Sequence, residues 1–182
     1  MGKGVPAALL ATTLRATIRA RLEFAEDPGR FLTEINRRIG ADLSYLDMFI
    51  TAQLAFFSHE SNELALASAG HCPALKYSQG SRHAVRLQLS GVPLGVLDEV
   101  HYETARERVT AGDRFVFLTD GIYEVESAAG EMLGFDRIAE QIPRFGAGPL
   151  PDFCGRLLDF LRTYSGGAPA TDDRTLLVLE CL

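Results

Sequence analysis

The stretch FVFLTDGIYE, residues 115–124, brings a carboxylate to the end of an apolar run and follows it with a glycine. The aromatic and branched residues at 115–118 favour a β-strand, and Gly121 allows the chain to turn tightly directly after Asp120. A plain Asp-Gly turn between two strands is the common interpretation of this pattern. The other interpretation is a strand that delivers a functional carboxylate to the edge of a sheet, and the stretch alone leaves both open.

The stretch TDDRTLLVLE, residues 171–180, has two adjacent carboxylates, Asp172 and Asp173, just before a predicted strand at 175–180. Adjacent carboxylates repel each other unless a cation or a donor offsets the repulsion, although a solvated loop is the simpler interpretation. Asp120 and Asp172 would lie side by side if their strands are neighbours in one sheet, and Mg²⁺ and Mn²⁺ prefer such oxygen ligands. Two such ions can activate a water for phosphate-ester hydrolysis, but they normally use more carboxylates than these two.

A third polar position is SAGHCPALKY, residues 68–77, in which Gly70 and His71 follow a predicted strand. A histidine there is either a metal ligand or general acid, or a turn residue that is hydrogen-bonded to the backbone. We favour the turn, because the other three histidines show no ligand spacing relative to His71 or to one another.

The first third of the chain is predicted to be helical. Pro6 suits the first turn of a helix, and leucine or isoleucine recurs every four residues through residues 10–22. Asp27 and Pro28, a cap residue and a first-turn proline, predict a second helix. The apolar face of that helix is predicted to contain Phe31, Leu32, Ile35 and Ile39, and its polar face Asn36, Arg37 and Arg38.

The middle of the chain changes to short runs rich in aromatic and branched residues. Residues 49–57 and 63–68 flank the polar HESN turn and predict a β-hairpin. Further strands are predicted at 74–77, 85–89, 102–109 and 114–118, and helices at 135–142 and 150–164 precede the closing strand at 175–180. Helices, then a block of strands, then helices and one strand predict an α+β domain with a mainly antiparallel sheet.

Composition excludes several classes of protein. A chain of 182 residues that is 47% hydrophobic fits one domain with a sizeable core. Three widely separated cysteines argue against a disulfide framework or a thiolate zinc site. The net charge of −6 with dispersed basic residues argues against a nucleic-acid surface. No stretch approaches the roughly 20 apolar residues that cross a bilayer, so we expect a cytoplasmic protein without a membrane partner.

Seven motifs, taken in order, are similar to those of one family of enzymes. They are GKGVPAALL, FLTEINRRI, SAGHCPALKY, GVPLGVLDE, FVFLTDGIYE, GFDRIAEQI and DDRTLLVLE. Together they run essentially from Gly2 to Leu182 and resemble the SpoIIE-type branch of the metal-dependent (PPM, type 2C-like) protein serine/threonine phosphatases. An unrelated α+β fold with a chance Asp-Gly turn would need all seven matches to be coincidences.

The resemblance implies a PPM-type αββα layered sandwich with antiparallel sheets, here as a single, partial domain over residues 1–182. It implies a bacterial enzyme of sigma-factor regulation that removes phosphate from serine or threonine of a regulatory protein, such as an anti-sigma-factor antagonist. The nucleophile would be a water activated by two Mn²⁺ or Mg²⁺ ions, with no catalytic residue beyond the metal ligands. Helices at 5–22 and 28–43 match the family's regulatory helices, through which an upstream sensor domain or a second copy in a homodimer would act.

The resemblance also assigns roles by motif. Asp120 and Asp172 match metal-binding aspartates of the family. The positions that match turns or neighbours of the metal site are Gly2, Gly4, Gly70, His71, Gly121 and Asp173. Of these, Gly2 and Gly4 match glycines that turn the chain beneath the metal ions.

The sequence departs from the family at its start. In the family, the GKG turn follows a strand that ends in an aspartate, and this aspartate bridges the two metal ions. Met1 stands directly before the turn, so we expect a truncation in which the N-terminal strands and the bridging aspartate are lacking upstream of Gly2. The alternative function is therefore a catalytically impaired or inactive regulatory or binding fragment of the same fold.

Overall fold

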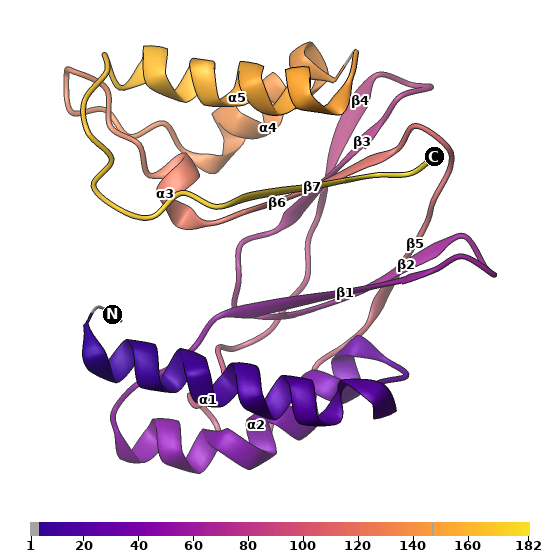
Figure 1. The fold of residues 1–182 in the computed structure, drawn as a ribbon, viewed down its shortest axis with the longest axis vertical. Helices are drawn as coiled ribbons and strands as arrows, with labels where there is room; N and C mark the ends of the chain where they lie inside the picture. The colour runs from indigo at the N-terminus through magenta and orange to yellow at the C-terminus, as the bar shows by residue number, and fades with distance from the viewer. Residues whose placement is uncertain (1–3, 147) are drawn as a thin grey trace. The chain divides into compact units, whose positions relative to one another are not determined.

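The computed structural model describes residues 4–146 and 148–182, and of Phe24 the backbone alone. The described residues form two compact units, each with helices packed on an antiparallel sheet (Figure 1). Unit 1 comprises residues 4–71 and 89–108, and unit 2 comprises Cys72–Gln88 and Val109–Leu182.

Unit 1 combines two long helices with a sheet in the strand order β1-β2-β5. Both strand pairs are antiparallel, and β1 and β2 form the predicted hairpin. Its elements are α1 (Val5–Arg21), the short helix η1 (Leu22–Phe24), α2 (Pro28–Tyr45), β1 (Ala52–Ser58), β2 (Glu63–Ala69) and β5 (Ala105–Arg108).

The core of unit 1 is built on helix α2, which contacts strands β1 and β2. The apolar face predicted for this helix is confirmed, because all four of its residues are buried. Asn36 was predicted on the polar face, and this is wrong, since the residue is only 1% exposed. Its Nδ2 donates to the carbonyl oxygen of Leu97 at 2.8 Å, and its Oδ1 accepts from the amide of Gly95 at 2.9 Å. These bonds satisfy the buried amide and attach the loop before β5 to α2.

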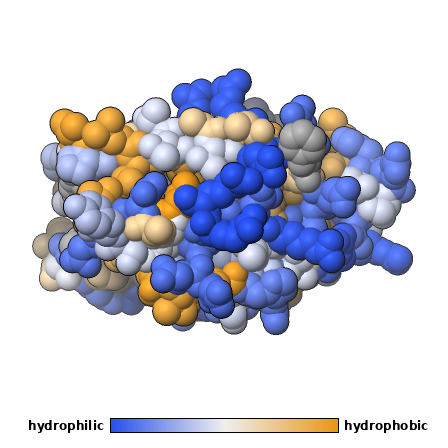
Figure 2. All heavy atoms as spheres, turned by 90° about the horizontal axis from the view of Figure 1, so that it is seen from below, coloured by the Kyte–Doolittle hydropathy of each residue, from blue (hydrophilic) through white to orange (hydrophobic). Residues whose placement is uncertain are grey.

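Helix α1 begins at Val5, with Gly4 as its N-cap and Pro6 in its first turn as predicted, but it is attached weakly. None of its residues, all of which the structure describes, is buried. Leu10, Leu14 and Ile18 are half-buried against the core of unit 1. A groove of about 870 Å³ follows the helix, lined by these three side chains and by residues 48–51. The outer face of α1 and α2 is mostly hydrophilic, with apolar patches toward one side (Figure 2).

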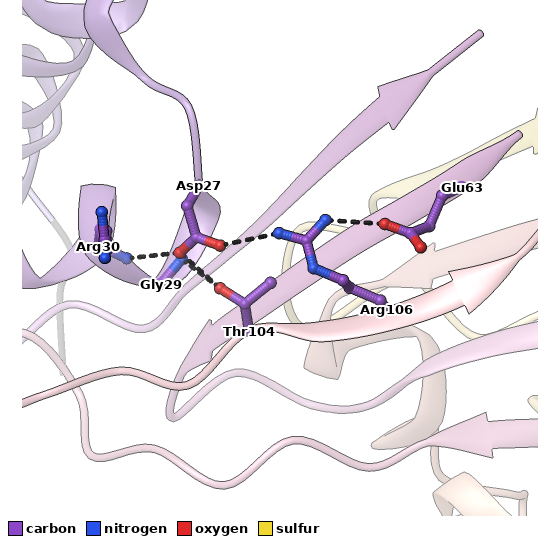
Figure 3. A network of polar contacts seen from close by, with 6 residues as sticks. All are labelled: Asp27, Gly29, Arg30, Glu63, Thr104 and Arg106. Atoms are coloured by element: carbon purple, nitrogen blue, oxygen red, sulfur yellow. Dashed lines mark hydrogen bonds and ion pairs between the residues drawn. The ribbon is translucent and has the colours of Figure 1, made fainter. Parts of the chain in front are cut away.

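A network of polar contacts holds the first turn of α2 to strand β5 (Figure 3). The carboxylate of Asp27 caps the helix by accepting from the amide of Arg30 at 3.0 Å, and it accepts from Thr104 Oγ1 at 2.7 Å. Arg106 lies between Asp27 and Glu63 and pairs with both. Burial raises the pKa of Asp27, but these bonds and the charge of Arg106 outweigh burial and hold that pKa below its usual value.

Unit 2 has a sheet in the order β4-β3-β6-β7, in which every pair is antiparallel. Helices α4 and α5 pack on it and on each other. Their facing residues form the second core, in which Ile138, Ile142, Phe153 and Leu157 are fully buried. The elements are β3 (Ala74–Ser78), β4 (His83–Leu87), β6 (Arg114–Leu118), α3 (Asp120–Tyr123), α4 (Phe135–Phe145), α5 (Leu150–Tyr164) and β7 (Leu176–Glu180).

The predicted elements exist, with shifted ends in several places. Helix α5 has the predicted bounds, whereas α4 continues through Pro143 to Phe145. Strand β4 begins two residues earlier than predicted, and β5 is shorter than the predicted strand at 102–109. The interpretation of Asp120 and Gly121 as a plain turn between two strands is wrong, because the chain enters the one-turn helix α3 there. Among the described residues, no helix is long and apolar enough to cross a membrane.

Candidate metal centre

Two loops of unit 2 lie side by side because strands β6 and β7 are antiparallel neighbours. Leu118, the last residue of β6, pairs with Leu176, the first residue of β7. The pairing continues one step beyond the strands, where the amide of Thr119 donates to the carbonyl oxygen of Thr175 at 3.2 Å. The loop that carries Asp120 therefore adjoins the loop that carries Asp172 and Asp173, as the neighbouring-strand argument expected.

The contact between these two loops is close and involves both backbone and side chain. Thr119 Oγ1 accepts from the amide of Thr175 at 2.9 Å and donates to the carbonyl oxygen of Asp173 at 3.4 Å. A Cβ atom on Gly121 would overlap that same carbonyl oxygen. Glycine at 121 is therefore required by the close approach of the second loop, in addition to any requirement of the turn.

In each loop, an aspartate carboxylate accepts from the amide of the residue that follows it. One oxygen of Asp120 accepts from the amide of Gly121 at 3.0 Å, and one oxygen of Asp172 accepts from the amide of Asp173 at 2.9 Å. Asp120, Asp172 and Asp173 are all solvent-exposed. Their oxygens are hard ligands of the kind that Mg²⁺ and Mn²⁺ prefer.

The carboxylate oxygens of these two loops could supply part of the ligands of a metal site. Residues 4–146 and 148–182 contain no group of three or more His, Cys, Asp or Glu side chains placed to hold one ion. Asp120 and Asp172 therefore offer suitable oxygen ligands from adjoining loops, but they supply fewer carboxylates than a two-metal centre uses.

A thiol and a phenol lie beside the Asp120 turn. Cys72 Sγ donates to the carbonyl oxygen of Leu118 at 3.1 Å and is hydrogen-bonded to the hydroxyl of Tyr123. Burial raises the pKa of the Cys72 thiol, the bond to Tyr123 opposes this, and the charge of Asp120 adds to it. Burial, with the neighbouring Cys72, Asp120 and Glu124, raises the pKa of Tyr123 to about 12. Both groups are therefore protonated near neutral pH.

The remaining predicted residues belong to unit 1 or lie outside the described residues. Gly70 has a φ of 68°, which favours glycine, and a Cβ there would lie 2.7 Å from the ring of Pro93. The amide of His71 donates to Ser68 Oγ at 3.2 Å, and Ser68 Oγ donates to the carbonyl oxygen of His71 at 3.3 Å. Gly4 precedes α1 with a φ of 84°, and Gly2 lies outside the described residues. That these residues are turns or neighbours of a metal site stays a prediction.

Sequence reasoning missed two residues of this site. Thr119 bonds to a loop 54–56 residues away, and its position directly before Asp-Gly was the one available signal. Cys72 received no role because it has no partner at metal-ligand spacing in the sequence. Its nearness to Asp120 depends on the pairing of β3 with β6, since Cys72 lies just before β3 and Asp120 just after β6.

Comparison with known proteins gives consistent matches. The family model described as Stage II sporulation protein E (SpoIIE) matches residues 1–182. Phosphoserine phosphatase RsbU of Bacillus subtilis (strain 168) is 29% identical over 130 residues, which cover 71% of this chain and 38% of RsbU. The chain thus spans well under half of that curated relative.

Solved structures share the fold over nearly the whole chain. The SiaA-PP2C domain of Pseudomonas aeruginosa is 25% identical with a TM-score of 0.84, and the match covers 97% of this chain and 71% of that one. The RsbU and RsbW domains of Rv1364c from Mycobacterium tuberculosis give 23% identity and a TM-score of 0.80, covering 99% of this chain and 49% of that one. With its helices and antiparallel sheets, the chain has the PPM-type α+β fold and belongs to the SpoIIE family of PPM-type phosphatases.

Proposed function

We propose that this chain is a metal-dependent protein phosphatase domain that hydrolyses phosphoserine or phosphothreonine on a regulatory protein. The observation that carries the proposal is the contact between two aspartate loops at adjoining ends of β6 and β7. The name of RsbU as a phosphoserine phosphatase supports the reaction. A substrate of the anti-sigma-factor-antagonist type is proposed from the motifs shared with the family, and the structure of Rv1364c, which has the same fold, contains an RsbU and an RsbW domain.

The metal ions of the proposal are Mn²⁺ or Mg²⁺. Among the similar structures, one of the SpoIIE phosphatase domain from Bacillus subtilis was presoaked with Mn, and one of RsbX is in complex with magnesium. In this chain, Asp120 and Asp172 would hold the ion, because both offer carboxylate oxygens from touching loops. Such ions supply a water of lowered pKa and neutralise phosphate oxygens.

The residues of the chain contribute orientation and charge to this reaction. The amides of Gly121 and Asp173 each hold one oxygen of the preceding aspartate, which leaves the carboxylates in defined orientations. The bare backbone at Gly121 permits the second loop to approach. The reaction needs no cysteine nucleophile, and the raised pKa of Cys72 keeps that thiol protonated near neutral pH.

A second candidate function is a regulatory or binding module of the same fold with little or no activity. The observation that favours it is that the described residues place no third carboxylate with Asp120 and Asp172. For both functions we propose that residues 1–182 form a single, partial domain that acts in signalling. An upstream sensor domain, homodimerisation through α1 and α2, and a cytoplasmic location likewise stay proposals.

A phosphatase assay with Mn²⁺ on a phosphoserine peptide separates the two functions. We expect metal-dependent release of phosphate that is abolished by Asp120→Asn. Asp159→Asn is the matched control, because Asp159 is an exposed carboxylate of unit 2, paired with Arg162 on α5. If the wild-type chain binds Mn²⁺ but releases no phosphate, the enzymatic function is rejected and the binding module is favoured. Equal activity of wild type and Asp120→Asn would reject the assigned metal site.

A further inference from the structure

We propose that Thr119 is a positioning residue, whose hydroxyl sets the place of the Asp172 loop relative to Asp120. The inference rests on the proposed metal centre and adds a residue to it. Thr119 itself offers no carboxylate and acts through the loop that it holds.

The first observation is that the Thr119 side chain does not cap helix α3. Thr119 is the N-cap of α3, with an extended backbone (φ −101°, ψ 164°). A threonine at that position usually accepts from an amide of its own helix, as the carboxylate of Asp27 does for α2. In the described chain, Thr119 makes no side-chain bond of this kind to α3. Its hydroxyl is directed across to the other loop instead.

The second observation is that the hydroxyl makes two bonds to that loop. A hydroxyl has one donor and two acceptor positions, so it can accept from Thr175 N at 2.9 Å and donate to Asp173 O at 3.4 Å together. These two bonds span both sides of the Asp173–Thr175 segment, directly after Asp172. The side chain thus fixes the loop at two points.

The third observation concerns what else attaches the loop. The close approach at Gly121 limits how near the Asp173 carbonyl comes, but a steric limit provides no attraction. The backbone bond from Thr119 N to Thr175 O continues the β6–β7 ladder and does not reach Asp173. The bond from the Thr119 hydroxyl to Asp173 therefore extends the attachment beyond the ladder, toward Asp172.

Three variants isolate the hydroxyl. Thr119→Val keeps the branched shape and removes the hydroxyl, whereas Thr119→Ser keeps the hydroxyl and should restore the wild-type behaviour. Thr163→Val is the control, because Thr163 Oγ1 donates to Asp159 O at 2.8 Å within α5. That control makes the same chemical change in unit 2 at a helix-internal bond. Thr119→Ala is a second variant without a hydroxyl if Thr119→Val does not fold, as judged by circular dichroism.

The first measurement is Mn²⁺ binding to the whole chain, followed by the electron paramagnetic resonance signal of free Mn²⁺. We expect Thr119→Val, which removes both bonds of the hydroxyl, to weaken binding by about tenfold, because a neutral hydrogen bond contributes modestly to a net free energy. Thr119→Ser and Thr163→Val should bind as the wild type does. A residue that merely stabilises the fold would lower the melting temperature without changing this affinity.

The second measurement, amide hydrogen exchange without metal, tests the bond directly. The amide of Thr175 should exchange faster in Thr119→Val than in the wild type and in Thr119→Ser. Faster exchange with unchanged Mn²⁺ affinity would overturn the positioning role and leave the metal centre intact. Unchanged exchange would overturn the bond itself, and equal weakening by Ser and Val would assign the effect to shape. A wild-type chain that binds no Mn²⁺ would overturn the proposed metal centre together with this inference.

Discussion

Replacing Asp27 with alanine would release the first turn of α2 from strand β5 (Figure 3). The lost capping bond to the amide of Arg30 is expected to cost about 1 kcal/mol. The lost bond from Thr104 Oγ1 adds about 1 kcal/mol, because its acceptor is charged but only partly buried. Arg106 is 53% exposed, so solvent screens its ion pair with Asp27 and the pair adds little to the sum. The expected loss in the free energy of unfolding is therefore about 2 kcal/mol.

Urea denaturation of the wild type and three variants tests this sum. Asp27→Asn keeps an oxygen that can cap the helix and accept from Thr104, so it should lose about 0.5 kcal/mol. Arg106→Ala removes the solvent-screened ion pairs with Asp27 and Glu63 and should lose clearly less stability than Asp27→Ala does. The reasoning is refuted if Asp27→Ala loses less than about 0.5 kcal/mol, or if Asp27→Asn loses as much as Asp27→Ala.

The same carboxylate predicts a pH dependence with a defined sign. The pKa of Asp27 is lowered in the folded chain from its ordinary value of 3.8. The stability that its charge provides is therefore fully present above pH 3.8 and is lost as the pH falls through the lower, folded pKa. The difference in stability between wild type and Asp27→Asn should shrink as the pH falls below 3.8. A difference that grows in that range would contradict the assigned direction.

Three further predictions address other contacts. Gly121→Ala places a Cβ against the carbonyl of Asp173 and should lower the free energy of unfolding, measured by urea denaturation, by about 1–3 kcal/mol. The control Gly155→Ala, with nothing within 4 Å of the added atom, should not lower it. Asn36→Ala leaves the Gly95 amide and the Leu97 carbonyl without their partner and should cost about 2–3 kcal/mol; a loss below about 1 kcal/mol would contradict that accounting. Because the pKa of Cys72 is raised above its ordinary value of 9.0, its alkylation by iodoacetamide should still accelerate above pH 9, and a plateau below that pH would refute the assignment.

Local patterns predicted the helices well because their start signals are local. Pro28 after Asp27, with apolar residues spaced along one face, was enough for α2. Asn36 was misplaced because its burial depends on the loop at 95–98, about 60 residues away along the chain. A polar residue beside two arginines looks solvent-exposed until its long-range partners are known.

The sequence pointed to the two carboxylates of the candidate site, and their role stays a prediction. Asp120 and Asp172 were each placed at one end of a predicted strand, but that these strands are antiparallel neighbours is known only from the structure. Thr119 could not be found in the same way, because its partners are backbone atoms of a distant loop that no residue type encodes. Its hydroxyl also stands where a local helix cap is the ordinary interpretation.

The shallow attachment of α1 has a consequence for how unit 1 opens. A helix with no buried side chain among its seventeen residues gives up little apolar contact when it detaches, so its opening free energy is expected to lie far below that of global unfolding. Arg21, at its C-terminal end, is tied to Glu34 of α2, which favours fraying from the other end. Trypsin should therefore cut after Arg15 and Arg19 under conditions in which α2 stays intact.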